Sequence, residues 1–204
     1  MATAGCASDP PRAVVGVVAD GCGPVSAVGT GVVVGDDLVA TSAHTLRGAD
    51  HIDVVAGGAR YTAEVVGFDP DLDLAYLAAP LPPGIAPLDV GTSHEGRATA
   101  WAFRGGSVVA VPVEIVRPIR LETEDIYVEG ATVRPAYELH ASIRPGDSGG
   151  PVVVDGAVVA LVWARSTRDD DVAYAIDLAR GRARIDEQRA TGELGDDVDL
   201  ARCD

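Results

Sequence analysis

The chain has 204 residues, of which 31 are Asp or Glu and 16 are Lys or Arg, and its formal net charge at pH 7 is −15. This charge argues against a nucleic-acid partner, because binding phosphates needs a basic face, and it suits the surface of a secreted protein. No apolar run reaches the length of a membrane helix and no basic-then-apolar signal peptide opens the chain, so we expect a mature domain.

Short apolar runs rich in valine predict β-strands along most of the chain. In the first part they are residues 14–18, 31–34, 52–55 and 63–66. A Pro- and Gly-rich segment at residues 79–84 then predicts a linker. Further strands are expected at residues 108–116, 136–141, 152–154 and 157–164. Only residues 178–189, where alanines and charged residues recur without β alternation, favour a helix, so the sequence predicts an all-β protein with a short C-terminal helix.

A serine lies between glycines at residues 146–151, which read Gly-Asp-Ser-Gly-Gly-Pro. Glycines let the backbone curl so that the N–H groups of Gly146 and Ser148 can point into one small hollow, an oxyanion hole, with the Ser148 hydroxyl at its edge. Such a serine becomes a nucleophile only with a base and an orienting acid. The segment predicts acyl-transfer chemistry, and an ordinary glycine turn is the alternative.

The order of residues along the chain limits the choice of base. All four histidines precede Ser148: His44, His51, His94 and His140. The nucleophile elbow of α/β-hydrolases is excluded because its histidine follows the serine, whereas the order His, Asp, Ser is that of two-barrel serine proteases. His44 ends an apolar run among small residues and is the predicted base. The other three histidines lack metal-ligand spacing and are interpreted as structural or surface groups, so neither a metal nor another cofactor is expected.

Three aspartates are candidates for the orienting acid. Asp73 opens an apolar run, so its carboxylate would be drawn towards the interior, where it can hold one tautomer of an imidazole. Asp69 and Asp71 flank Pro70 and are typical of a solvated turn. We therefore predict Asp73 as the acid and keep Asp71 and Asp69 as alternatives.

The segments around these residues resemble the trypsin-like (chymotrypsin-fold) serine proteases, in their HtrA/Deg-like branch. The matching segments are Ala43-His44, Asp73-Leu74-Ala75 and residues 146–151. Within that branch, Gly29-Thr30-Gly31, Phe68-Asp69-Pro70 and Pro82-Pro83 look like the actinobacterial membrane-anchored acid-resistance (MarP-like) proteases, and the likeness runs from about Val14 to the C-terminus. The chain differs from the usual pattern of this family at Ser42 and at the Phe-Arg-Gly-Gly turn of residues 103–106. Neither difference removes a catalytic group.

The resemblance implies two six-stranded antiparallel Greek-key barrels and a short C-terminal helix. We expect an N-terminal extension at residues 1–12, a first barrel carrying His44 and Asp73 at residues 13–84, a second barrel carrying Ser148 at residues 85–176, and the helix and tail at residues 177–204. It implies a monomeric serine endopeptidase that cleaves polypeptides through an acyl-enzyme intermediate. The alternative is a dormant two-barrel binding or stress-sensing module with a collapsed oxyanion loop.

The resemblance also indicates where a substrate would bind. In the trypsin-like pattern the base of the specificity pocket lies six residues before the nucleophile, here at Ser142. Because Ser142 cannot pair with a cation, cleavage after Lys or Arg is not expected. Trp163, Ala164 and Arg165 resemble the edge that pairs with the substrate backbone. Arg165 would stand near the pocket mouth, or alternatively turn outward to solvent.

The chain has three cysteines, Cys6, Cys22 and Cys203. The resemblance pairs Cys22 with Cys203, which would tie the C-terminal tail to the first barrel in an oxidising compartment, and three free thiols are the alternative. Cys6 is left over; its surroundings are similar to a lipoprotein cleavage site but lack the preceding apolar run. We expect an extracytoplasmic location, secreted or on the periplasmic side of the cell envelope, with membrane contact only through an anchor upstream of this chain.

Overall fold

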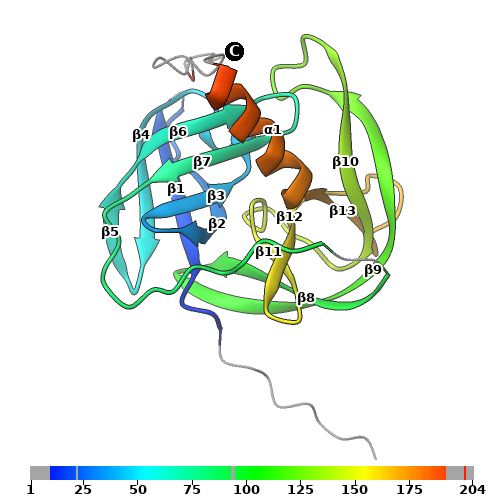
Figure 1. The fold of residues 1–204 in the computed structure, drawn as a ribbon, viewed down its shortest axis with the longest axis horizontal. Coiled ribbons are helices and arrows are strands. Elements are labelled where there is room, and N and C mark those ends of the chain that lie inside the picture. Colours follow the sequence, from blue (N-terminus) through cyan, green and yellow to red (C-terminus); the bar gives the residue numbers. More distant parts are fainter. Residues whose placement is uncertain (1–9, 22, 93–94, 192–199, 201–204) are drawn as a thin grey trace, which may run out of the picture.

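The computed structural model describes residues 10–21, 23–92, 95–191 and 200, which form two β units and one helix (Figure 1). The first unit is an antiparallel sheet of seven strands in the order β5-β4-β1-β2-β3-β7-β6. Its strands are β1 (Val14–Gly21), β2 (Ala27–Gly35), β3 (Leu38–Thr41), β4 (Ala49–Ala56), β5 (Ala59–Thr62), β6 (Glu64–Asp69) and β7 (Leu74–Ala78). This unit has seven strands where six were expected. Gly57 and Gly58, with φ of 58° and 83°, form the tight turn between β4 and β5.

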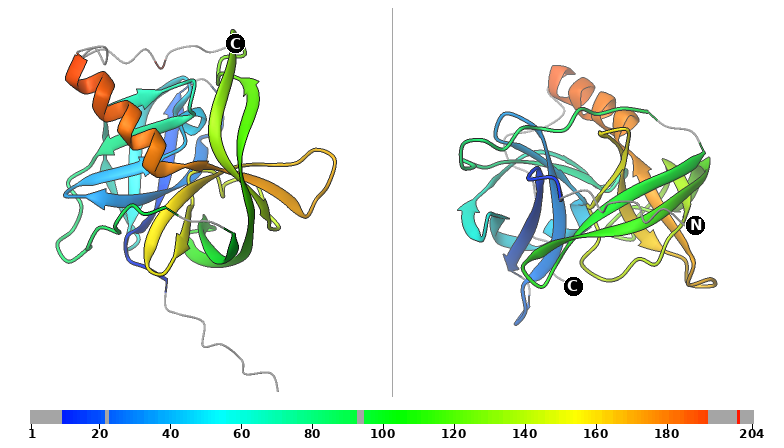
Figure 2. Two further views of the ribbon diagram at one scale, coloured as in Figure 1. Left: turned by 45° about the vertical axis from the view of Figure 1, so that its right-hand side comes forward. Right: turned by 90° about the horizontal axis from the view of Figure 1, so that it is seen from below.

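The second unit is a closed barrel of six strands in the order β10-β13-β12-β11-β8-β9. Its strands are β8 (Gly96–Arg104), β9 (Ser107–Glu124), β10 (Ala131–His140), β11 (Pro151–Val154), β12 (Ala157–Arg165) and β13 (Val172–Asp177). Figure 2 shows the long, twisted β9–β10 hairpin rising from this barrel beside the first unit. The predicted all-β fold with two antiparallel units is confirmed.

Each unit has its own core of small apolar side chains. Val17, Val39 and Leu74 are fully buried in the first core, as are Leu139 and Val152 in the second. Burying a valine or leucine side chain contributes about 1.5–3 kcal/mol relative to leaving it exposed. The valine-rich runs of the sequence therefore form the two cores. The candidate site residues lie mostly at strand ends and in the loops that follow them.

The predicted C-terminal helix, α1 (Leu178–Thr191), is confirmed and follows β13 directly. It begins at the fully buried Leu178 and crosses back to the first unit (Figure 1). Gly181 allows this approach, because a Cβ there would lie 2.7 Å from Cδ2 of Leu74. Among the described residues no helix is both long and apolar enough to cross a membrane.

Candidate active site

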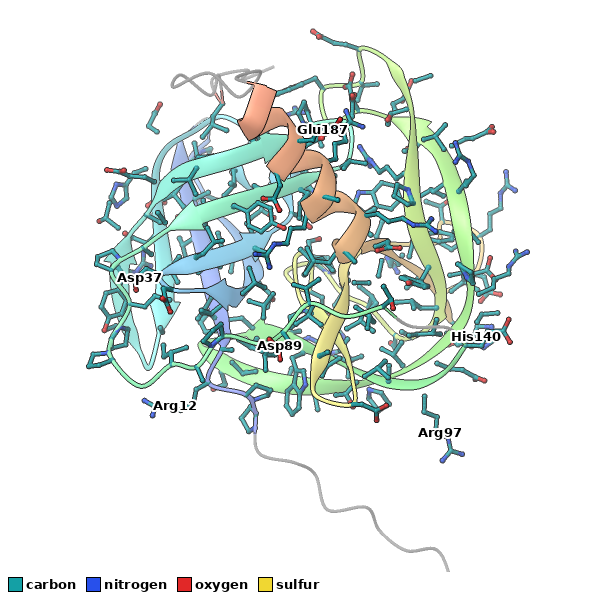
Figure 3. All side chains as sticks on the ribbon, in the orientation of Figure 1. Arg12, Asp37, Asp89, Arg97, His140 and Glu187 are labelled. Atoms are coloured by element: carbon teal, nitrogen blue, oxygen red, sulfur yellow. The ribbon has the colours of Figure 1, made fainter. Side chains whose placement is uncertain are left out.

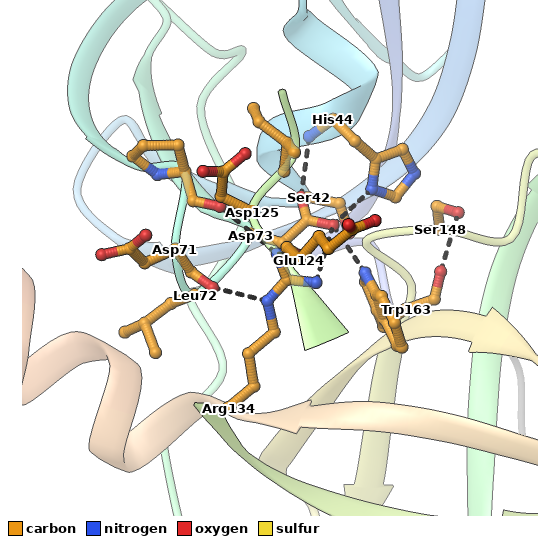
Figure 4. Close-up of polar contacts among 12 residues, drawn as sticks. Ser42, His44, Asp71, Leu72, Asp73, Glu124, Asp125, Arg134, Ser148 and Trp163 are labelled. Carbon is orange, nitrogen blue, oxygen red and sulfur yellow. Dashed lines mark hydrogen bonds and ion pairs between the residues drawn. The ribbon is translucent and has the colours of Figure 1, made fainter. Parts of the chain in front are cut away.

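His44 lies on the 3₁₀ turn η1 (Ala43–Leu46), which follows β3. Its Nδ1 is 2.7 Å from Oδ2 of Asp73, and its backbone N–H donates to Oδ1 of the same carboxylate at 2.7 Å. Asp73 therefore fixes both the main chain and the ring of His44 (Figure 4). Because Nδ1 faces a carboxylate, the ring is held with Nε2 directed away from the acid.

Asp73 is buried and adopts a left-handed backbone conformation, with φ of 58°. A non-glycine residue in that region is strained and persists only where its surroundings hold it. Burial alone would raise the pKa of Asp73, but the charge and hydrogen bonds of His44 keep that pKa below its ordinary value. For His44, burial lowers the pKa, while the charge of Asp73 and its hydrogen bond raise it above the ordinary value. These pKa shifts favour an ionised Asp73 beside His44.

The two alternative acids have other partners. Oδ1 of Asp69 accepts the N–H of Leu72 at 2.8 Å, and Oδ2 lies 2.9 Å from Nε of Arg184 in α1. Asp71 is half-exposed and pairs with the same arginine at 2.9 Å. The expectation that Asp69 is solvated is wrong, because it is 1% exposed and closes the turn before Asp73. The structure brings only Asp73 of the three into contact with His44.

Ser148 lies in the loop between β10 and β11. Its hydroxyl donates to the carbonyl of Trp163 at 3.4 Å (Figure 4), and within the described residues it has no hydrogen bond to His44. Both units form hydrogen bonds to this loop. The N–H of Thr30 in the first unit donates to Ser148 O, and the N–H of Gly149 donates to Val162 O in the second, each at 2.8 Å. Gly149 is required here, because a Cβ would lie 2.1 Å from the carbonyl oxygen of Thr30.

The N–H groups of Gly146 and Ser148, predicted to form the oxyanion hole, donate to no other described residue. Gly146 has a φ of 94°, a conformation suited to glycine. The neighbouring N–H groups are used within the structure: that of Asp147 donates to Arg144 O at 3.1 Å and that of Gly150 to Asp147 O at 2.9 Å. The two N–H groups predicted for the oxyanion hole therefore differ from their immediate neighbours in having no acceptor among the described residues.

Arg104, at the end of β8, was missed by the sequence reasoning as a site residue. It pairs bidentately with Asp147, Nε to Oδ1 at 2.7 Å and Nη2 to Oδ2 at 2.5 Å. Asp147 is 1% exposed and also accepts the N–H of Arg144 at 2.9 Å. The only signal was the unusual turn at residues 103–106, which places an arginine where the family pattern has none.

Arg134, on β10, was also missed. It is 1% exposed, and its guanidinium lies against the acid and the ring of Trp163. Trp163 occupies a bulge between Val162 and Ala164 on β12, and its indole N–H donates to Oδ2 of Asp73 at 2.6 Å. A bulge re-aims one side chain of a strand, which explains how a predicted substrate-edge residue also contacts the acid.

The predicted substrate-binding residues line two different cavities. Trp163 and Ala164 share a cavity of about 340 Å³ with His44 and Asp73. Ser142 is exposed and lines a separate cavity of about 460 Å³ with Asp169 and Asp171, among others. The expectation against cleavage after Lys or Arg considered Ser142 alone, whereas in the structure two aspartates also line its cavity.

The remaining predicted residues lie outside the site or outside the described part of the chain. Arg165 is 58% exposed and forms an ion pair with Asp170 at 3.4 Å. His51 pairs with Asp53 at 3.0 Å and His140 lies 3.9 Å from Glu114, at the outer edge of the second barrel (Figure 3). His94, Cys6, Cys22 and Cys203 are not among the described residues. Across the described ranges no group of three or more His, Cys, Asp or Glu is placed to hold a metal ion.

Comparison with known proteins shows the family of the chain. Residues 29–161 match the family model "Trypsin-like peptidase domain". The serine protease Rv3671c of Mycobacterium tuberculosis is 33% identical over 175 residues, which are 82% of this chain and 43% of that protein. A probable periplasmic DegP-like serine endoprotease of Marinomonas sp. is 30% identical over 186 residues, covering 84% of this chain and 38% of the relative. The chain thus spans less than half the length of these curated relatives.

The fold is also similar to solved structures. The crystal structure of the Rv3671c protease in its active form matches with a TM-score of 0.83 and 28% identity, covering 95% of this chain and 86% of that one. The expected likeness to HtrA-like proteases is therefore confirmed. The chain belongs to the trypsin-like peptidase family and is an HtrA-like serine protease domain.

Proposed function

We propose that this domain hydrolyses peptide bonds within polypeptides through the triad His44, Asp73 and Ser148. The observation that carries the proposal is the double hydrogen bond from His44 to the buried, ionised Asp73, beside the glycine loop of Ser148. His44 removes the proton of the Ser148 hydroxyl as that oxygen attacks the carbonyl carbon, and Asp73 stabilises the resulting imidazolium. His44 then protonates the leaving amine, and water repeats the sequence on the acyl-enzyme.

The N–H groups of Gly146 and Ser148 are proposed to hold the negative charge that develops on the carbonyl oxygen. Each such donor contributes on the order of 3 kcal/mol to the transition state. Their freedom from other described partners supports this role. Before attack, the Ser148 side chain must rotate from the carbonyl of Trp163 towards Nε2 of His44.

The substrate is proposed to be a polypeptide outside the cytoplasm. The DegP-like relative is named as a probable periplasmic endoprotease, and the strongly acidic composition suits such a location. We also propose that the domain acts as a monomer and that the HtrA-like resemblance extends to a MarP-like role at the cell envelope.

A dormant binding module is the second candidate, and one observation favours it. The Ser148 hydroxyl bonds to Trp163 O and not to the base, as in a site that is not engaged. Treatment with a fluorophosphonate probe separates the candidates. A working protease forms a covalent adduct at Ser148 that is lost in Ser148→Ala and retained in Ser142→Ala. A dormant module gives no adduct at Ser148, and that result would contradict the proposed protease activity.

A further inference from the structure

Arg134 is a charged side chain enclosed by the two units. Its guanidinium donates to three backbone carbonyls: Nε to Asp71 O at 2.5 Å, and Nη2 to Pro70 O at 3.3 Å and Glu124 O at 3.0 Å. Asp71 and Pro70 belong to the β6–β7 turn that leads into Asp73, while Glu124 ends β9 of the barrel. A buried charge is costly unless its hydrogen bonds are made, so these bonds join the acid's turn to the second barrel.

The same guanidinium faces the acid and its indole donor. Nη1 lies 4.0 Å from Oδ2 of Asp73, and Cζ lies 5.0 Å from the centre of the Trp163 ring. This distance is within the range of a cation–π contact. The carboxylate of Asp73 is therefore surrounded by His44, Trp163 and Arg134 (Figure 4).

Other charged groups surround this cluster. Burial lowers the pKa of Arg134, whereas the charges of Asp69 and Asp71 in the β6–β7 turn and of Asp125 in the β9–β10 hairpin raise that pKa. Glu124 lines the cavity that also includes His44, Asp73 and Arg134. Arg184 of α1 pairs with Asp69 and Asp71, and Arg47 donates to the carbonyl of Ile126 in the hairpin. Arg134 is the cation that lies against the Asp73 carboxylate itself.

We propose that Arg134 is a positioning residue that fixes Asp73 against the second barrel and whose positive charge favours the neutral, reactive form of His44. The charge acts because a cation near the imidazole opposes its protonation. In agreement, the charge of Arg134 lowers the pKa of both His44 and Asp73. Without it, Asp73 would stabilise the imidazolium unopposed, and His44 would stay protonated to a higher pH. This inference rests on the proposed function, because it concerns the same triad.

Two substitutions separate the charge of Arg134 from its hydrogen bonds. Arg134→Lys keeps the positive charge but loses the planar guanidinium that donates to three carbonyls, so kcat should fall about tenfold. Because the charge remains, the acid limb of the kcat/KM profile should stay within about 0.2 pH unit of wild type. Arg134→Met loses both, so the acid limb should move upward by at least about half a pH unit. Arg117→Met is the matched control, because it removes an exposed arginine from the same barrel, and its profile should match wild type.

A second readout does not need turnover. In a Ser148→Ala background, the titration of the His44 ring is followed by NMR, with the signal assigned by its loss in His44→Gln. The His44 midpoint should rise in Arg134→Met and not in Arg134→Lys or Arg117→Met. An unmoved midpoint and acid limb in Arg134→Met would overturn the charge role, and full kcat in Arg134→Lys would overturn the positioning role. If Arg134→Met does not fold, the kcat of Arg134→Lys still tests the positioning role. A shifted midpoint in a protein whose wild type cleaves nothing would support the charge role and contradict the proposed function instead.

Discussion

Two hydrogen bonds and one strained residue define the site at the scale of single residues. Asp73 has a positive φ and is 3% exposed, and its two oxygens are used by His44, with Trp163 sharing Oδ2. An amide in place of the carboxylate would present its NH2 group either to the backbone N–H of His44 at the Oδ1 position or to the ring nitrogen and the indole N–H at the Oδ2 position. These contacts suit the role proposed for Asp73, which is to hold one tautomer of His44.

Asp73→Asn should leave the domain folded and lower kcat by a factor on the order of 10⁴, because His44 would adopt the wrong tautomer. Asp71→Asn is the matched control: Asp71 is half-exposed and pairs with Arg184, so its activity should stay within about threefold of wild type. Steady-state hydrolysis of a fluorogenic peptide measures both. Full activity in Asp73→Asn, or a large loss confined to Asp71→Asn, would show that the acid has been misassigned.

The pH dependence follows from His44. Its pKa is raised above the ordinary value because the attraction of Asp73 outweighs the opposing effect of burial. The base must be neutral, so activity is lost as the pH falls through this raised pKa. We expect kcat/KM to be half-maximal at a pH above about 6.5. A half-maximal value clearly below that pH would contradict the coupling between His44 and Asp73.

At the scale of elements, β8 and the nucleophile loop are joined by one ion pair. Asp147 is almost fully buried beside Ser148, and Arg104 reaches it from the end of β8 with two hydrogen bonds. Removing one partner of a buried pair leaves the other charge uncompensated. The loop that carries Ser148 is therefore tied to a residue 43 positions before Asp147 in the chain.

Arg104→Gln should lower the free energy of unfolding by about 3–5 kcal/mol and slow fluorophosphonate labelling of Ser148. The reason is that the loop would have to rearrange to expose the unpaired carboxylate of Asp147 to water. Adding Asp147→Asn removes the buried charge, so the double variant should recover part of both losses. Urea denaturation gives the free energy of unfolding, and labelling rates give the reactivity of Ser148, for the wild type, both single variants and the double variant. Strictly additive effects of the two substitutions would mean that the pair does not hold the loop.

The residues of the proposed triad could be named from the sequence because their signals are local. Each residue of the proposed triad has a recognisable feature beside it in the sequence. These features are the glycines around Ser148, the small residues before His44 and the apolar run after Asp73. Arg104 and Arg134 carry no such local signal, since their roles depend on strand ends that meet only in the folded barrel. The burial of Asp69 was misjudged for the same reason, because Arg184 reaches it from a helix more than 100 residues later.

At the scale of the whole molecule, Leu200, the last described residue, lies against the first unit near the end of β1. The N–H of Gly48 hydrogen-bonds to the carbonyl of Leu200, and Ala49 pairs with Gly21 at the end of β1. Gly21 directly precedes Cys22, and Leu200 stands three residues before Cys203. This arrangement supports the proposed Cys22–Cys203 disulfide.

The disulfide would close a loop of about 180 residues and, in the chain-entropy model, stabilise the domain by up to about 5 kcal/mol. Reduction should then lower the melting temperature by roughly 10 °C, and Cys22→Ser should do the same. Cys6→Ser, which removes the remaining cysteine, is the control and should melt like wild type. Non-reducing peptide mapping tests the pairing directly, and free thiols at both positions in air-oxidised protein would disprove it.

The central claim is that Ser148 and His44 perform peptide hydrolysis, and the most direct measurement is the cleavage of casein by purified variants. Wild type should cleave it, whereas Ser148→Ala and His44→Ala should remain folded by circular dichroism and lose at least about 10³-fold in rate. Ser142→Ala and His140→Ala, which change the same residue types outside the triad, should retain substantial activity. Cleavage by Ser148→Ala at the wild-type rate would contradict the account.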